Sequence, residues 1–246
     1  MTTKTIFFLG ATGGCGLSAM RRSLAAGHTC IALCRTPSKL TAILPPSEHP
    51  NLIIVEGNAH SSEPVRQGLI HPTAPKAFVD YVISSIGNAV SWEGMRNADA
   101  DVCRKGMELI ISTMNALRKE GYTGRPRILG VSSTGISDFA RDLPIAMIPL
   151  YKVALAIPHR DKKAMENVLI ESGEDWTVVR PSALTNGKGG ETTVRDGMED
   201  PIAKKVESKA IGYTISREDT GKWIFEKIIE EGAARKWVKK IATVTY

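Results

Sequence analysis

The stretch GATGGCG at residues 10–16 constrains the fold of this chain more than any other feature. It follows KTIFFL (4–9), whose β-branched and aromatic residues predict a short buried strand. It precedes LSAMRRSLAA (17–26), in which apolar residues recur on one face of a predicted helix. Glycines in such a turn let a phosphate approach the free backbone N–H groups at the helix N-terminus.

This turn predicts a binding site for the pyrophosphate of a dinucleotide. Its spacing is G-x-x-G-x-x-G and departs from the G-x-G-x-x-G pattern, so an ordinary strand-to-helix turn is the alternative. The strand, turn, helix and second strand follow in the order that the mechanism requires. We expect the cofactor to be held by Gly10, Thr12, Gly13, Gly14, Cys15 and Gly16.

The end of the second predicted strand, HTCIALCR (28–35), indicates which dinucleotide binds. Sites that prefer NAD usually carry Asp or Glu there, to bind the ribose 2′-hydroxyl. Here Arg35 stands at the strand end, with Ser38 and Lys39 after it. Arg35 is suited to a 2′-phosphate, with Lys39 as a second donor, so we predict NADP(H). The alternative is that these cations are solvated loop residues.

The rest of the chain alternates strand and helix patterns. Such alternation predicts an α/β fold, a Rossmann-like doubly wound parallel sheet with helices on both faces. We expect one domain over 1–246, with 181–215 inserted as a small C-terminal substrate lobe. The predicted strands are 5–9, 29–33, 52–56, 81–85, 128–132 and 176–180, and the predicted helices are 16–26, 62–70, 97–120 and 160–172.

Ligands of parallel sheets bind at the carboxyl ends of the strands, so the residues at those ends are the candidate site. Each of these segments alone is also ordinary turn composition, and only their coincidence at strand ends favours a site. The further candidates for cofactor binding are Asn58, Ala59, Ser85, Ile86, Gly87, Ser132, Pro181 and Ser182, and Ser133 is the candidate for the substrate oxygen.

Three later segments depart from the alternation. Residues 136–158 are apolar with three prolines, which fits a hydrophobic flap beside the cofactor or, equally, a dimer contact or packed core. Residues 186–215 are rich in glycine and charge, and we expect them to extend over the substrate mouth. At the C-terminal end, Ser216 is the predicted N-cap of an amphipathic helix, with Asp219 three residues on. The basic run RKWVKK (235–240) is interpreted as a solvated terminal helix.

Composition and charge exclude several classes of protein. The net charge is +6, but the basic residues are dispersed, so we expect no nucleic-acid partner and no membrane partner. The four cysteines and five histidines lack metal-ligand spacing, so no metal is expected. With no leader pattern, we expect a cytoplasmic monomer or homodimer that acts on a small molecule.

Several motifs together resemble the atypical short-chain dehydrogenase/reductase superfamily, in particular its NAD(P)H-binding, NmrA-like group of flavin reductase/biliverdin reductase B-like proteins. The motifs are GATGGCG (10–16), CRTPSKL (34–40), SSTG (132–135), HRDKKAMENVLIESGEDWTVVRP (159–181) and ISREDTGKWI (215–224). The resemblance spans nearly the whole chain. It implies a Rossmann-like sheet with NADP(H) on the first turn.

The resemblance also implies a catalytic Tyr-x-x-x-Lys pattern with an upstream serine. Lys162 matches the lysine, which would hold the nicotinamide ribose, but Pro158 stands where the tyrosine acid is expected. His159 is a candidate replacement, and Tyr151 is another if its loop bends toward the site; a solvent proton is the third option. We therefore expect an NADPH-dependent reductase of an apolar, conjugated or quinone-like molecule. A non-catalytic NADP(H) sensor and an isomerase or epimerase with tightly bound cofactor are the alternatives.

Overall fold

The structure is a computed structural model. It describes residues 2–87, 99–149, 151, 155–230 and 234–246. A nine-stranded sheet forms its centre, in the order β3-β2-β1-β4-β5-β6-β11-β8-β9. Seven of these strands are parallel: β1 Thr5–Leu9, β2 Thr29–Cys34, β3 Leu52–Glu56, β4 Tyr81–Ser84, β5 Arg127–Val131, β6 Asp175–Pro181 and β11 Lys240–Thr245. The predicted Rossmann-like class is confirmed.

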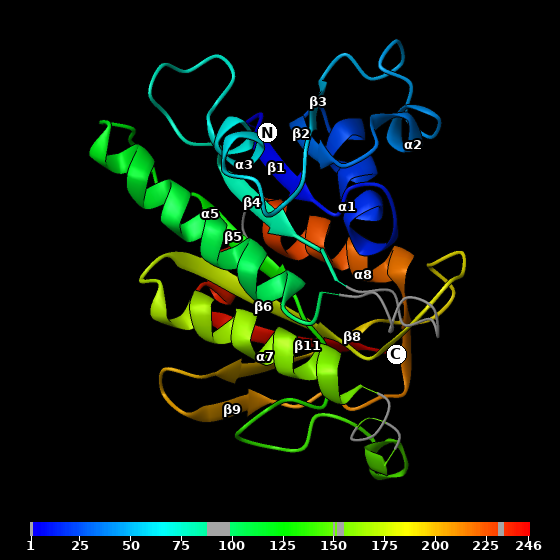
Figure 1. Ribbon diagram of the computed structural model, residues 1–246. Coiled ribbons are helices and arrows are strands. Elements are labelled where there is room, and N and C mark those ends of the chain that lie inside the picture. The colour runs from blue at the N-terminus through cyan, green and yellow to red at the C-terminus, as the bar shows by residue number, and fades with distance from the viewer. Residues whose placement is uncertain (1, 88–98, 150, 152–154, 231–233) are drawn as a thin grey trace.

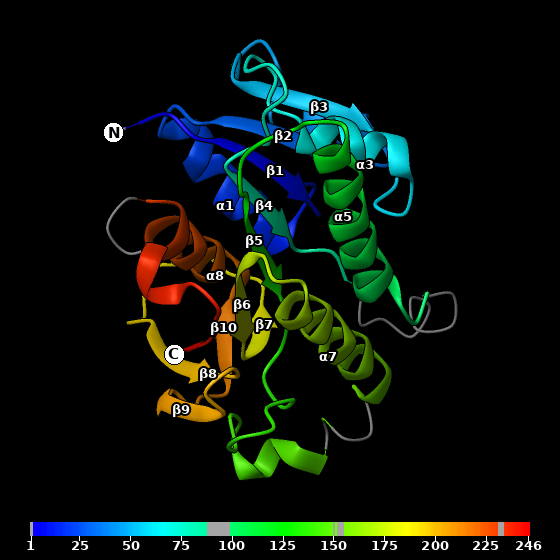
Figure 2. The same cartoon turned by 90° about the vertical axis from the view of Figure 1, so that its left-hand side faces the viewer.

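The sheet has helices on both faces, as Figure 2 shows. One core layer packs α1 (Gly14–Ala25) and α8 (Arg217–Ile224) on the sheet. The other packs α3 (Ser62–Leu69), α5 (Val102–Lys119) and α7 (Ala156–Glu171) on the opposite face. The interior strands β1, β2, β4, β5 and β6 are almost fully buried, which explains their continuous apolar sequences, whereas the edge strand β3 is only partly buried. The shorter helical segments are α2 Pro37–Thr41, the 3₁₀ turns Ile145–Met147 and Ala234–Trp237, and the π-helical turn Phe225–Ile229.

The segment after β6 builds two structures. β7 (Ala183–Thr185) and β10 (Thr214–Ser216) form a separate two-stranded parallel sheet. Between them, β8 (Arg195–Asp200) and β9 (Lys205–Ser208) form a hairpin that joins the central sheet antiparallel to β11. That residues 181–215 act as a substrate lobe stays a prediction.

The interpretation of RKWVKK as a solvated helix is wrong. The structure has a short 3₁₀ turn over Ala234–Trp237, followed by β11 between β6 and β8 inside the sheet. Trp237 is 1% exposed and packs edge-on against Trp223 of α8. Burial of this indole and the β-branched sequence that follows outweigh the local run of charge.

Element bounds otherwise follow the sequence patterns. β1 and β3 have the predicted bounds, and Ser216 caps α8 by accepting a hydrogen bond from the Asp219 N–H, as expected. α5 begins at Val102; the predicted start at 97 lies outside the described residues. α7 begins four residues before the predicted 160 because Pro158 falls in its first turn, where a missing N–H has no cost.

Candidate active site

The glycine turn lies at the carboxyl ends of β1 and β4. Gly10 has a φ of +84°, and a Cβ atom there would lie 2.6 Å from Ser85 Oγ. The Ser85 hydroxyl donates to the carbonyls of Leu9 (3.1 Å) and Gly10 (3.2 Å). The first glycine therefore serves the close approach of the two strand ends and the left-handed turn between them.

The N-terminus of α1 is open to a ligand. Its N-cap, Gly13, offers no side chain to the first N–H groups of the helix, and no acidic residue stands in the first turn. A Cβ at Gly13 would meet no atom within 4 Å. Thr12 is exposed beside it, whereas the Cys15 thiol is buried and burial raises its pKa to about 11. Free N–H groups, the helix dipole and open space together fit a pyrophosphate.

The second strand ends in exposed cations. Arg35 follows β2 directly, and Lys39 lies on α2. Within the described residues, neither side chain has a hydrogen bond or an ion pair, so both are available to a ligand. After β3, the Asn58 side-chain oxygen accepts from the His60 N–H (3.2 Å), and Ala59 packs against the core. Asn58 thus shapes its own turn through that oxygen.

Lys162 connects the ends of β4 and β5 from α7. Its ammonium donates to the carbonyls of Ile86 (2.8 Å) and Val131 (2.7 Å), and a Cβ at Gly87 would lie 3.4 Å from it. An ammonium has three protons, so one remains for a further acceptor. The structure therefore brings Lys162 together with Ile86 and Gly87, as the strand-end rule predicts.

His159 lies on the same helix, α7, as Lys162, and the side chains of Ser133 and Tyr151 lie next to it. Ser133 Oγ donates to the Thr134 carbonyl (3.1 Å) and lies 3.3 Å from His159 Nε2. The rings of His159 and Tyr151 lie 5.3 Å apart, so the two side chains are neighbours. Burial lowers the pKa of His159 below 6.5 and raises that of Tyr151 above 10.0. Both side chains are therefore neutral near pH 7.

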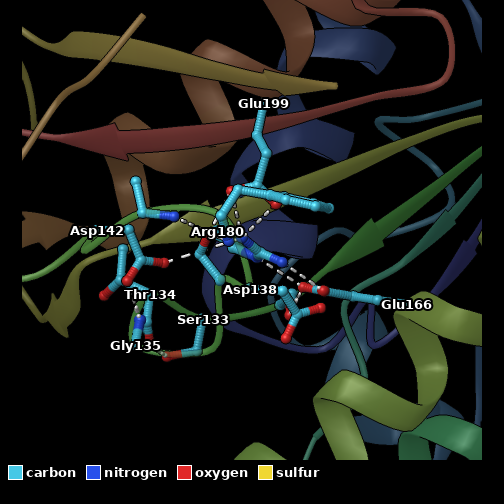
Figure 3. A network of polar contacts seen from close by, with 12 residues as sticks. Ser133, Thr134, Gly135, Asp138, Asp142, Glu166, Arg180 and Glu199 are labelled. Carbon is cyan, nitrogen blue, oxygen red and sulfur yellow. Dashed lines mark hydrogen bonds and ion pairs between the residues drawn. The ribbon is translucent and has the colours of Figure 1, made fainter. Parts of the chain in front are cut away.

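A buried charge network holds the loop that carries Ser133 (Figure 3). Arg180 is fully buried and binds Glu166 through two hydrogen bonds, Nε to Oε1 (2.9 Å) and Nη2 to Oε2 (2.7 Å). Its Nη1 donates to Glu199 at 3.1 and 3.2 Å. Burial opposes the charge of Arg180, but Glu166 and Glu199 raise its pKa further. Arg180 thus keeps its charge inside the core, with a carboxylate on either side.

The acids of this network each hold one part of the loop after β5. Glu166 accepts from the Ser132 hydroxyl at 2.6 Å, and Glu199 accepts from the hydroxyl of Ser137. Asp142 accepts from the Gly135 N–H at 2.9 Å, and burial raises the pKa of Asp142. The Ser132 hydroxyl therefore positions the loop.

This network was not predicted from the sequence, because its charges come from three separate elements, α7, β6 and β8, that meet only in the folded protein. The sequence feature that could have indicated the network is an arginine within the apolar strand sequence DWTVVRP.

The predicted cofactor residues after β6 face the sheet. Pro181 is buried, and its carbonyl accepts from the Thr134 N–H at 3.1 Å. Ser182 is 3% exposed, and its hydroxyl lies 2.9 Å from that of Thr245 on β11. The Ser182 N–H also donates to the Val244 carbonyl at 3.0 Å, so the Ser182 hydroxyl and these backbone groups are already paired within the protein.

A cavity of about 860 Å³ opens at the same edge of the sheet. In Figure 1 this edge carries β10, the C-terminus and the 145–147 turn. The cavity wall is mostly apolar, with exposed Ile145 and Tyr213, and it includes the cations Arg141 and Arg195. Two segments that departed from the alternating pattern, 136–158 and 186–215, therefore supply the walls of one cavity; residues 150 and 152–154 of the first lie outside the described part.

Other ligand classes find little support in the described residues. No group of three or more His, Cys, Asp or Glu side chains there is placed to hold a metal ion. The four cysteines are buried and form no disulfide. Among these residues no helix has the length and apolar character needed to span a membrane.

The chain is similar to a known protein family and to two curated proteins. The model of the NAD(P)H-binding family matches residues 10–231. A reductase of Aspergillus terreus, pytE, is 38% identical and is covered to 98%, as is this chain. An oxidase of Aspergillus niger, pynE, is 30% identical, with 100% of this chain and 99% of the relative covered.

Two solved structures share the fold. A short-chain dehydrogenase/reductase of Veillonella parvula in complex with NADP has a TM-score of 0.73 at 18% identity, covering 100% of this chain and 95% of the other. ChuY, an anaerobillin reductase of Escherichia coli, has a TM-score of 0.68 at 18% identity, covering 98% and 96%. At this identity the likeness concerns the fold.

Proposed function

The chain belongs to the NAD(P)H-binding family and is an oxidoreductase, and from this premise we propose that it is an NADPH-dependent reductase of an apolar, conjugated or quinone-like small molecule. The observation that carries the proposal is the meeting of Ser133, His159 and Lys162 at the carboxyl edge of the sheet, which also carries the open glycine turn.

The cofactor preference rests on charge at the end of β2. The residues there fit NADPH, since Arg35 and Lys39 are exposed and unpaired among the described residues and no carboxylate follows the strand. The backbone of Gly13 to Cys15 would hold the pyrophosphate, and the remaining proton of Lys162 would bind the nicotinamide ribose. When bound, NADPH supplies a hydride.

The proton chemistry follows from the Ser133–His159 pair. Ser133 would donate a hydrogen bond to the substrate oxygen and pass it a proton. His159, neutral at pH 7 and 3.3 Å away, would give its Nε2 proton to the serine while it takes up a solvent proton at Nδ1, so the imidazole returns to its neutral form. The ion pairs of Arg180 keep the serine loop in place during this transfer. Tyr151 is buried with its ring against His159 and would take no part in the proton transfer, so Tyr151→Phe should change the rate little.

The substrate class rests on the cavity. Its apolar wall and volume of about 860 Å³ suit a molecule of several rings, and the lining cations Arg141 and Arg195 suit an electron-rich oxygen on that molecule. Arg141 donates one hydrogen bond, to the Leu143 carbonyl at 2.7 Å, and keeps further donors.

The test measures binding and turnover separately. NADPH is titrated calorimetrically, and its oxidation is then followed by absorbance with a panel of quinones, flavins and aryl ketones. The expected result is oxidation by at least one compound class, slowed by roughly ten- to a thousandfold in Ser133→Ala with the NADPH affinity kept. Ser112→Ala, an exposed hydroxyl on α5, is the matched control. Tight NADPH binding without oxidation by any compound would favour the sensor instead.

A further inference from the structure

Arg217, the first residue of α8, lies over the glycine turn although it is about 200 residues away along the chain. A Cβ atom at Gly14 would lie 3.5 Å from Arg217 Cδ and 3.9 Å from its Nε. The two helices cross closely here, since the Ser18 hydroxyl of α1 donates to the Glu218 carbonyl at 2.8 Å. The position of Arg217 at the N-terminus of α1 is therefore fixed by helix packing.

Arg217 is held by one of its guanidinium nitrogens. Nη1 donates to the Leu184 carbonyl (3.1 Å) and to Asn186 Oδ1 (2.8 Å). The neighbouring acids are otherwise engaged: Glu218 pairs with Arg22, and Asp219 accepts from Ser216 and Tyr246. Among the described residues, Arg217 forms no ion pair, and Nε and Nη2 keep their donors.

We propose that Arg217 binds the pyrophosphate of the cofactor from the side opposite the α1 N–H groups and so ties the cofactor to residues 184–186. The inference rests on the proposed function, which supplies the dinucleotide. Two observations carry it besides the helix end: a half-buried cation that lacks a carboxylate, and a donor fork placed within reach of Gly14.

The same contact links the cofactor to the cavity. Leu184 lies in β7 and pairs with Ile215 of β10, next to Thr214 in the cavity wall. A pyrophosphate held by Arg217 therefore stabilises the position of Leu184 and Asn186 and, through β10, one side of the cavity. By linkage, an occupied cavity then strengthens cofactor binding by the same factor.

The first measurement separates Arg217 from Arg35. Calorimetric titration of Arg217→Gln should show NADPH and NADH weakened by the same factor, about ten- to a hundredfold, because the pyrophosphate is common to both. Arg217→Lys should recover part of the loss. In Arg35→Ala only the preference for NADPH over NADH should fall. Asn186→Ala keeps the guanidinium and removes one tie to the lobe, so its NADPH affinity should change less than that of Arg217→Gln.

The second measurement reads the link to the lobe by limited trypsin digestion. The exposed bond after Lys188 lies in the segment that Arg217 holds through Asn186. NADPH should slow this cleavage in the wild type, and Arg217→Gln and Asn186→Ala should abolish most of that protection at saturating NADPH.

The outcomes are distinct. If the wild type binds NADPH and Arg217→Gln binds it equally well, this inference is wrong and the proposed function stands. If the variant binds weakly but NADPH does not protect Lys188 in the wild type, the link to the lobe is wrong. If the wild type binds neither dinucleotide, the proposed function fails, and the inference fails with it.

Discussion

Replacing Gly13 by valine should abolish NADPH binding while leaving the fold intact. Gly13 has a φ of −176°, extended backbone that any residue adopts, and a Cβ there would meet no atom within 4 Å. The protein itself therefore leaves room for the new side chain. A Val at the N-cap lacks any capping group, so we expect the free energy of unfolding to change by no more than about 1 kcal/mol.

The loss of affinity follows from what occupies that space in the complex. A pyrophosphate at the α1 N-terminus accepts charge-assisted hydrogen bonds, each worth about 1.5–3 kcal/mol. If the valine side chain displaces it from two of them, binding weakens by about 3–6 kcal/mol, or more than about a hundredfold. Gly13→Ala adds a single methyl group and should fall between the valine variant and the wild type.

Calorimetric titration gives the affinity, and thermal unfolding followed by circular dichroism gives the stability. A change of about 1 kcal/mol should move the melting temperature by no more than about 2–4 °C in a chain of this size. Gly16→Val is the contrasting control: its Cβ would lie 2.2 Å from Ser85 Oγ and 2.6 Å from the Gly10 carbonyl oxygen, so it should impair folding itself. Wild-type NADPH affinity in a folded Gly13→Val protein would refute the phosphate site at this turn.

Three further predictions test other parts of the site. Arg35→Ala should lower the affinity for NADPH by about ten- to a hundredfold and leave that for NADH unchanged in parallel titrations; equal losses would contradict the 2′-phosphate contact. Lys162→Met should weaken NADPH binding and slow its oxidation, and wild-type values in both assays would remove the lysine from the site. Because burial lowers the pKa of His159 below 6.5, the free energy of unfolding should fall as pH drops below about 6.5, and His159→Gln should reduce that fall in urea titrations.

Local sequence patterns predicted those elements of the fold whose bounds depend on neighbouring residues in the sequence. The bounds of β1 and β3, the glycine turn and the Ser216 cap each depend on residues within a few positions of one another. The central position of β11 depends instead on pairing with β6 and β8, which come much earlier in the chain. The alternation in KIATVT indicates a strand. The basic run RKWVKK, which overlaps its first residue, favoured the prediction of a solvated helix instead.

The candidate site also has parts that the sequence predicts and parts that depend on the packing of distant elements. The gathering of the candidate cofactor residues at one edge was predictable because the carboxyl ends of parallel strands lie at the same edge of a sheet. The charge network was not, because Glu166, Arg180 and Glu199 meet only after three elements have packed. Sequence reasoning also placed Ser132 at the cofactor, whereas its hydroxyl donates to Glu166 inside that network. The structure thus assigns neighbouring serines different surroundings, one in the core and one beside His159.

Pro158 occupies the position on α7 where the family resemblance predicts a tyrosine acid, so the helix carries no tyrosine there. At the third position of α7 a residue has no intrahelical partner for its N–H, so proline is tolerated and fixes where the helix begins. The tyrosine nearest to the site instead lies on the loop before α7, with its ring against His159 rather than on the helix face that carries Lys162. Burial raises the pKa of that phenol, and no cation within the described residues opposes the shift. The lysine that would normally acidify a tyrosine donates to two backbone carbonyls instead. Under the proposed function, proton transfer would therefore fall to Ser133 and His159, the pair that the loop after β5 and the start of α7 bring within 3.3 Å.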